Sequence, residues 1–282
     1  MIRFELNRCL RGKGIKLAVL LAVLLAAGEF FGYRILFQET KEIADEIRRQ
    51  QGFSPSGLYP SSLYEGFING DAFTIFNLLY YYLFPILAVL PFGCSFFTDE
   101  NSGYLKYIYS QKKKENYLLA KYTAVFLSGA VAGILPAIFS FLANALYLPA
   151  IIPNTLALQS HTNDSSVMAD FYYTCPWAYF LVYLLLGMLA GGFLATLALS
   201  ASFFARNALL VLFSPMIFYT ALDYALAELG HSEFSISTII NPVGTHYIER
   251  ITLGGMFLEI SAFAAAAFLV FFFIGKKRER IL

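Results

Sequence analysis

Charged residues are scarce in this chain of 282 residues, because only 14% of them are Asp, Glu, Lys or Arg. Soluble domains carry about 25% charged residues, whereas 58% of the residues here are hydrophobic. The net charge is +1, so the sequence gives no reason to expect nucleic acid as a partner. This shortage of charge is not typical of a soluble domain, and the positions of the few charges carry more information than their sum.

Side chains that bind metal ions are also few. The three cysteines, Cys9, Cys94 and Cys175, are far apart and form neither a zinc-binding spacing nor an even-numbered disulfide set. The three histidines are scattered through separate segments with no spacing that brings them together. We therefore expect no metal site.

The sequence lacks the common catalytic motifs. The Gly-Lys pairs at 12–13 and 275–276 have no glycine five residues earlier, so neither is a P-loop. No H-E-x-x-H is present, and residues 52–56 have serine where G-x-S-x-G requires its last glycine. We expect no catalytic residues and no directly bound cofactor, and a membrane-embedded enzyme remains a hypothesis without a motif.

Long hydrophobic runs are abundant. Residues 257–274 read FLEISAFAAAAFLVFFFI, and about 20 apolar residues in a helix cross the ~30 Å hydrocarbon layer of a bilayer. We predict an all-α, polytopic membrane protein with six transmembrane helices in one domain over residues 1–282. The predicted spans are 15–37, 72–96, 117–148, 176–204, 208–229 and 254–274, and we expect Pro85 and Pro91 to kink the second of them.

Basic residues alternate between the two sides of this layout. Most of the 20 lysines and arginines fall in the N-terminus, the loops that follow the second and fourth spans, and the C-terminus. The other side receives only Arg34, Lys41, Arg48, Arg49 and Arg250. Under the positive-inside rule, this pattern predicts six spans with both termini in the cytoplasm.

Two segments on the outer side are expected to contact the membrane. Residues 40–51, TKEIADEIRRQQ, place Ile43 and Ile47 four apart among charges, as in a short amphipathic helix on the membrane surface. Residues 230–253 are moderately apolar and broken by Asn241, Pro242 and Gly244, as in a segment that enters the membrane and returns.

The loop after the second span, residues 97–116, is the segment in which we expect function. Its polar start, Thr98 to Ser102, is suited to cap a helix. Tyr104, Tyr107 and Ile108 then follow at helical spacing beside Lys106. Tyrosine and basic residues on a short exposed helix are typical of an interface, although an ordinary capped surface helix has the same pattern.

This loop resembles a segment in the membrane subunits of type-2 ATP-binding-cassette (ABC) exporters. The matching residues are Phe96, Asp99, Gly103, Lys106, Tyr117 and Lys121. In that family the segment is a coupling helix that sits in a groove of a separate ATPase subunit. The resemblance implies this coupling role for the polar and aromatic residues Asp99, Glu100, Gly103, Tyr104, Lys106 and Tyr107.

The resemblance implies further features of the chain. Residues 1–13 would form an amphipathic helix on the inner membrane surface, involving Phe4, Arg8, Leu10 and Arg11. Residues 230–253 would form a re-entrant segment. The partners would be a nucleotide-binding ATPase subunit that uses ATP-Mg, a second permease subunit (identical or related) and the lipid bilayer. The location would be a plasma membrane, with a bacterial source.

The resemblance makes the chain a non-catalytic subunit, and the sequence indicates a class of cargo. The abundance of apolar residues and the lack of a soluble binding domain favour an amphipathic or hydrophobic cargo, such as a peptide, an antimicrobial or a lipid-like molecule. A stand-alone secondary transporter or channel is the alternative, and it would require paired charges or broken helices near the middle of the membrane.

Acidic residues within the predicted spans are candidates for a substrate path, because a buried charge in a membrane is costly. Glu29 and Asp223 are the candidates, and Glu29 has Arg34 five residues later as a possible structural partner. Three spans also carry two glycines four residues apart, which permits close helix packing, either within one subunit or between two.

Overall fold

The computed structural model describes residues 1–52, 62–71, 74–153, 162, 166–242 and 250–277, and every regular element in these ranges is a helix. Five of the helices are long and apolar enough to cross a membrane. They are α2 (Lys13–Gln51), α6 (Lys114–Ala145), α8 (Pro176–Ala201), α9 (Ala208–Glu228) and α11 (Leu253–Lys277). The chain is therefore an all-helical, multi-pass membrane protein, as its hydrophobic runs predict.

The predicted second span, residues 72–96, is divided in the structure. Its main part is α3 (Ile75–Val89), whose 15 residues extend about 22 Å at 1.5 Å per residue, less than the ~30 Å hydrocarbon layer. A turn then leads into α4 (Ser95–Asn101). Pro91 lies in that turn and has no N–H to continue the hydrogen-bond ladder, which explains why the helix is interrupted.

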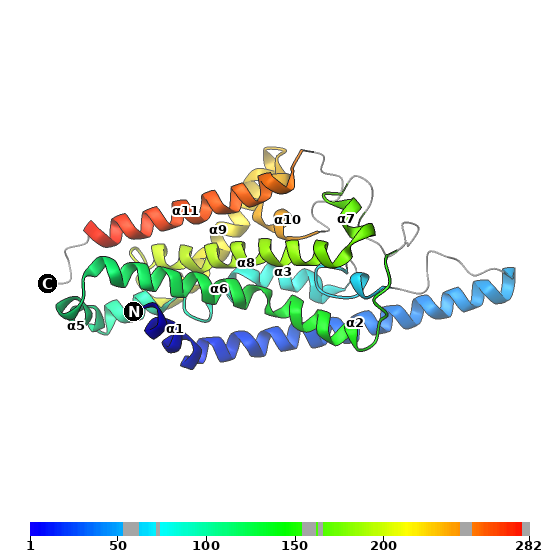
Figure 1. Ribbon diagram of the computed structural model, residues 1–282, viewed down its shortest axis with the longest axis horizontal. Coiled ribbons are helices and arrows are strands. Elements are labelled where there is room, and N and C mark those ends of the chain that lie inside the picture. Colours follow the sequence, from blue (N-terminus) through cyan, green and yellow to red (C-terminus); the bar gives the residue numbers. More distant parts are fainter. Residues whose placement is uncertain (53–61, 72–73, 154–161, 163–165, 243–249, 278–282) are drawn as a thin grey trace.

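Helix α2 is longer than predicted. The first span and the surface helix expected at residues 40–51 form one continuous helix of 39 residues. The sequence between Gly32 and Gly52 contains neither glycine nor proline, so nothing ends the helix until Gly52 adopts a left-handed conformation at φ 75°. The last turns of α2 extend beyond the rest of the molecule (Figure 1), and the separate surface helix does not form.

Helices α6 and α8 form the centre of the bundle, with α2 and α11 on opposite sides of the pair (Figure 1). Small residues let their backbones approach closely. A Cβ atom added at Gly129 would lie 2.3 Å from Cβ of Ala195 and 2.7 Å from the carbonyl oxygen of Gly191. At these positions the spaced glycines serve packing within one subunit.

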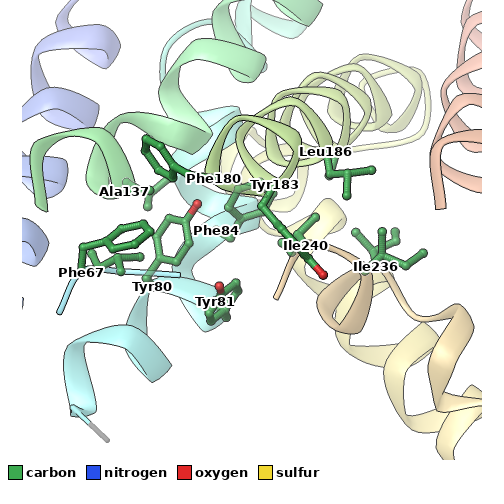
Figure 2. Close-up of a cluster of buried hydrophobic side chains, with 14 of the residues drawn as sticks. Phe67, Tyr80, Tyr81, Phe84, Ala137, Phe180, Tyr183, Leu186, Ile236 and Ile240 are labelled. Carbon is green, nitrogen blue, oxygen red and sulfur yellow. The ribbon is translucent and has the colours of Figure 1, made fainter. Parts of the chain in front are cut away.

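Aromatic side chains fill the core beside α6 and α8 (Figure 2). Phe141 of α6 stacks on Phe180 of α8 with ring centroids 4.4 Å apart, and Phe67 meets both rings edge-on at 5.2 and 5.0 Å. Phe67 follows the short helix η1 (Leu63–Glu65), so the segment after α2 folds back into the bundle. Tyr80 of α3 donates a hydrogen bond to the carbonyl of Gly133, 3.1 Å away.

Further short elements lie at the end of the bundle towards which α2 projects (Figure 1). They are α7 (Ala169–Thr174), η2 (Ser232–Phe234) and α10 (Ile236–Ile240). Helix α10 is largely buried and packs against α8 and α9. The predicted re-entrant segment, residues 230–253, includes α10, but residues 243–249 lie outside the described part of the chain.

Candidate functional site

The two segments with predicted functional roles lie at the opposite end of the bundle (Figure 1). They are α1 (Ile2–Arg11) and the loop helix α5 (Tyr104–Gln111). The last turn of α11 reaches the same end, where the Lys276 ammonium lies 2.7 Å from the Glu115 carboxylate at the start of α6. The N-terminal helix, the loop between α3 and α6 and the end of α11 therefore share one end of the molecule.

Five side chains from α1, α4 and α6 form a polar cluster beneath this end, here called the charge cluster. Lys121 places its Nζ 2.8 Å from Glu5 Oε2 and 2.6 Å from Asp99 Oδ2. Tyr117 donates its hydroxyl to Asp99 Oδ2 at 2.7 Å. Arg8 donates from both of its Nη atoms to the two oxygens of Asp99, with Nη1 3.1 Å from Oδ2.

The charge cluster is almost completely removed from solvent. The side chains of Glu5 and Lys121 are 0% exposed and that of Asp99 is 1% exposed, while Arg8 is 34% exposed. Two carboxylates face two cations, so the formal charges balance. A buried charge is tolerated when it is paired and hydrogen-bonded, and removing one partner leaves the others uncompensated. The cluster therefore ties α1, α4 and α6 together.

Aromatic rings complete the surroundings of the two cations. The Lys121 ammonium lies 4.5 Å from the centre of the Phe92 ring, and the Arg8 guanidinium lies 4.8 Å from the centre of the Tyr104 ring. Cations over ring faces at such distances are attracted by the ring quadrupole. Tyr104 begins α5, so Arg8 connects α1 to the loop helix as well as to α4.

Two opposing effects act on the Asp99 carboxyl. Burial raises its pKa, but the hydrogen bond from Arg8, the charge of Lys121 and further hydrogen bonds outweigh burial and leave the pKa below its ordinary value of 3.8. The same hydrogen bond raises the pKa of Arg8, even though burial acts against it. Asp99 is therefore an ionised partner in the cluster.

The lowered pKa of Asp99 predicts a pH dependence of stability. The contribution of the Asp99 carboxylate is fully present above its ordinary pKa of 3.8 and is lost as the pH falls through the lower folded value. The difference in unfolding free energy between the wild type and Asp99→Asn is expected to be constant from pH 7 to pH 5 and to shrink on further acidification. Denaturant unfolding in detergent at each pH measures it, and a difference that grows below pH 4 would contradict this assignment.

Helix α5 has one buried face and one exposed face. Leu105 is 1% exposed and packs into the bundle, whereas Tyr107 is 60% exposed and Lys106 is also exposed. The polar residues predicted to cap this helix instead belong to α4, and the residue that precedes α5 is Gly103 at φ 75°. Only glycine adopts this left-handed conformation without strain, so Gly103 allows the sharp change of direction between α4 and α5.

The predicted coupling residues consequently divide into two groups. Lys106, Tyr107 and Gly103 are exposed and Tyr104 and Glu100 are half-buried, so these five are accessible to a partner. Asp99 is buried in the charge cluster, so its contribution is to hold α4 in place.

The predicted membrane-surface residues of α1 divide in the same way. Phe4 is 56% exposed and Leu10 is 67% exposed, and Arg11 is exposed beside them. Arg8 instead turns inward to Asp99. Sequence reasoning did not identify Glu5, although Glu5 is an acid among arginines in a basic helix. Lys121 was matched to a motif but was not recognised as a buried cation that needs partners.

The two acids assigned to a substrate path have structural partners. Glu29 is 0% exposed, accepts a hydrogen bond from the Thr74 hydroxyl and lies close enough to Asp71 for their charges to interact. The predicted pairing of Glu29 with Arg34 is not formed: Arg34 lies over the Tyr147 ring at 5.2 Å, since residues five apart point about 140° away from each other on a helix. Asp223 accepts a hydrogen bond from Ser237 at 2.8 Å.

Among the described residues, no group of three or more His, Cys, Asp or Glu side chains is arranged to hold a metal ion. No protein-family model, curated protein or solved structure matches this chain. The arguments about function therefore rest on the geometry of the chain itself.

Proposed function

We propose that the chain is the membrane-spanning permease subunit of an ATP-driven ABC exporter of the type-2 class. It has six spans, both termini are cytoplasmic, and α3 with the turn that follows it forms the second span. Energy comes from a separate nucleotide-binding subunit that binds ATP-Mg, and a second permease subunit, identical or related, completes the path. The cargo is amphipathic or hydrophobic, and the location is a bacterial plasma membrane.

The observation that carries this proposal is the arrangement around α5. A short helix exposes Tyr107 and Lys106 at the end of the bundle, while its other side is held by Leu105. Tyrosine is among the side chains that commonly supply much of the binding energy at the centre of a protein interface. A partner that docks on α5 would act on a helix already fixed to the bundle.

The charge cluster supplies a route for mechanical coupling. A force on α5 reaches α4 through Gly103 and reaches α1 through the contact between Tyr104 and Arg8. Asp99 and Lys121 connect both helices to α6, which is one of the two most buried long helices. ATP bound to the partner would favour one arrangement of this rigid unit over another. This requires ATP to bind the two arrangements with different affinities, because only such a difference lets a ligand shift a conformational equilibrium.

A stand-alone secondary transporter is the second candidate, and one observation favours it. Glu29 and Asp71 are 0% and 1% exposed and lie near each other in the bundle. Buried acids of this kind are frequent in proton-coupled transport. The two proposals differ in their energy source, so dissipating the proton gradient should stop a secondary transporter and leave ATP-driven export in reconstituted vesicles active.

Tyr107→Arg is expected to weaken docking of the ATPase subunit about 30-fold, which corresponds to the loss of one interface residue of about 2 kcal/mol. The side chain is exposed, so the melting temperature of the permease should remain close to that of the wild type. Co-purification in mild detergent, followed by titration of the ATPase subunit, measures the change.

Tyr107→Phe is the matched control, because it retains the ring and should retain docking. Unchanged docking in Tyr107→Arg would remove this residue from the interface. If no ATPase subunit binds the wild type, and substitutions of Gly103 leave transport intact, the exporter proposal fails as a whole.

A further inference from the structure

An open groove lies between the first residues of α1 and the start of α6. Its volume is about 540 Å³, and its lining comes from both helices and the short link between α5 and α6. The lining residues are Met1, Ile2, Arg3, Lys112, Asn116, Leu119 and Ala120. The groove is separate from the exposed tyrosine face of α5 and from the buried charge cluster.

Two cationic side chains line this groove without a compensating acid. Arg3 and Lys112 are exposed, and neither forms an ion pair with a residue in the described ranges. The neighbouring acids are engaged elsewhere, since Glu5 pairs with Lys121 and Glu115 pairs with Lys276. The groove therefore complements an anion.

The remainder of the groove is apolar. Ile2 is 45% exposed and Leu119 is 40% exposed, while Asn116 lies one turn before Leu119 on α6. One turn of helix corresponds to about 5 Å along the axis, so the polar part and the apolar part of the groove follow each other along α6. A small free anion makes no favourable contact with the apolar part of the groove. A lipid matches both parts, because its headgroup fits the polar part and its acyl chain fits the apolar part.

The groove also lies where the apolar run of α6 begins. Helix α6 begins with Lys114, Glu115 and Asn116, and its apolar run starts at Tyr117. Polar and basic residues at this position of a span lie at the level of the lipid headgroups. Lysine and arginine near an anionic leaflet attract its lipids.

We propose that this groove is a binding site for one anionic phospholipid, whose headgroup phosphate lies between Arg3 and Lys112 and whose acyl chain runs along Leu119. Such a lipid would join the N-terminal helix to the start of α6 from the membrane side. The proposal does not depend on the ATPase partner, and it holds for an exporter and for a secondary transporter alike.

Native mass spectrometry of the full chain in detergent, titrated with phosphatidylglycerol, tests the site. The double variant Arg3→Gln, Lys112→Gln is expected to weaken the tightest phosphatidylglycerol adduct about 25-fold, since each cation near a lipid phosphate contributes about fivefold. The control variant Lys16→Gln, Lys277→Gln removes the same charge from exposed positions at the same end and should retain the adduct. Equal weakening in both variants would show general surface attraction and overturn the proposal.

Two further arms separate a lipid site from a free phosphate site. Inorganic phosphate at millimolar concentration should not displace phosphatidylglycerol, and phosphatidylcholine should bind at least tenfold more weakly. Leu119→Ser should weaken phosphatidylglycerol about fivefold because it removes apolar contact with the chain. Displacement by phosphate together with an unaffected Leu119→Ser variant would identify the groove as a small-anion site and contradict the lipid assignment.

Discussion

Lys121→Met is expected to lower the free energy of unfolding by about 3–5 kcal/mol, the usual cost of removing one partner from a buried ion pair. The substitution fits the space of the aliphatic stem but leaves Glu5 and Asp99 with only Arg8 as a cation. The Glu5 carboxylate would lose the most electrostatic stabilisation, because its nearest remaining cation is Arg8 at 3.6 Å, whereas Lys121 lies at 2.8 Å in the wild type. Denaturant unfolding of the purified chain in detergent measures the loss.

Lys276→Met provides a matched control. Lys276 also pairs with a glutamate, Glu115, at 2.7 Å, but both side chains are about half exposed. Exposed pairs contribute about 0–1 kcal/mol, so this variant should change stability by no more than that. Glu5→Gln added to Lys121→Met should recover part of the loss, because it restores the balance between Arg8 and Asp99. Equal effects of Lys121→Met and Lys276→Met would show that the charge cluster does not stabilise the fold.

Gly129→Ala is expected to destabilise the bundle by about 3 kcal/mol, the upper range for an added methyl group in a close-packed core. The new Cβ would lie 2.3 Å from the Ala195 Cβ. It would also lie 2.7 Å from the carbonyl oxygen of Gly191 and 3.0 Å from the carbonyl oxygen of Ala88. Carbonyl oxygens belong to backbone and cannot turn aside, so α6 would have to move away from both α3 and α8. The shift should appear as a lower unfolding midpoint.

Gly254→Ala is the control for this variant. A Cβ at Gly254, in the first turn of α11, has no neighbour within 4 Å. The free energy of unfolding of the Gly254→Ala variant should rise by less than about 1 kcal/mol, since alanine favours a helix more than glycine does. A Gly129→Ala variant as stable as the wild type would mean that α6 and α8 are farther apart than described.

The membrane-crossing parts of the long helices could be predicted from the sequence because each is a hydrophobic run, whereas the polar continuation of α2 to Gln51 could not. The starts of α8 at Pro176 and of α9 at Ala208 agree with the predicted boundaries. Proline favours the first turn of a helix, as in α8, and the Asn207 side chain caps the start of α9. The kink expected at Pro91 in the second span is present as the turn that ends α3, whereas Pro85 lies inside α3 without ending it. Hydrophobicity continues through Pro91, whereas the hydrogen-bond ladder does not.

The site was predicted only in part, since its organisation depends on contacts between distant segments. Local spacing identified α5 and its exposed Tyr107. It could not reveal that Asp99 meets Lys121, which is 22 positions later, or that Glu5 from α1 completes the arrangement. The expected pair of Glu29 and Arg34 was wrong because closeness in sequence does not place two residues on the same face of a helix.

Photo-crosslinking at position 107 tests the central claim most directly. The photoreactive amino acid p-benzoylphenylalanine replaces Tyr107 in the full chain, expressed in its native cells, and a second variant carries it at the exposed Leu229, beyond the far end of α9. We predict that position 107 crosslinks to a protein with a P-loop ATPase domain and that position 229 does not. If position 107 yields no ATPase while remaining accessible, or if it is labelled by impermeant reagents from outside intact cells, α5 is not the docking helix of an ATP-driven exporter.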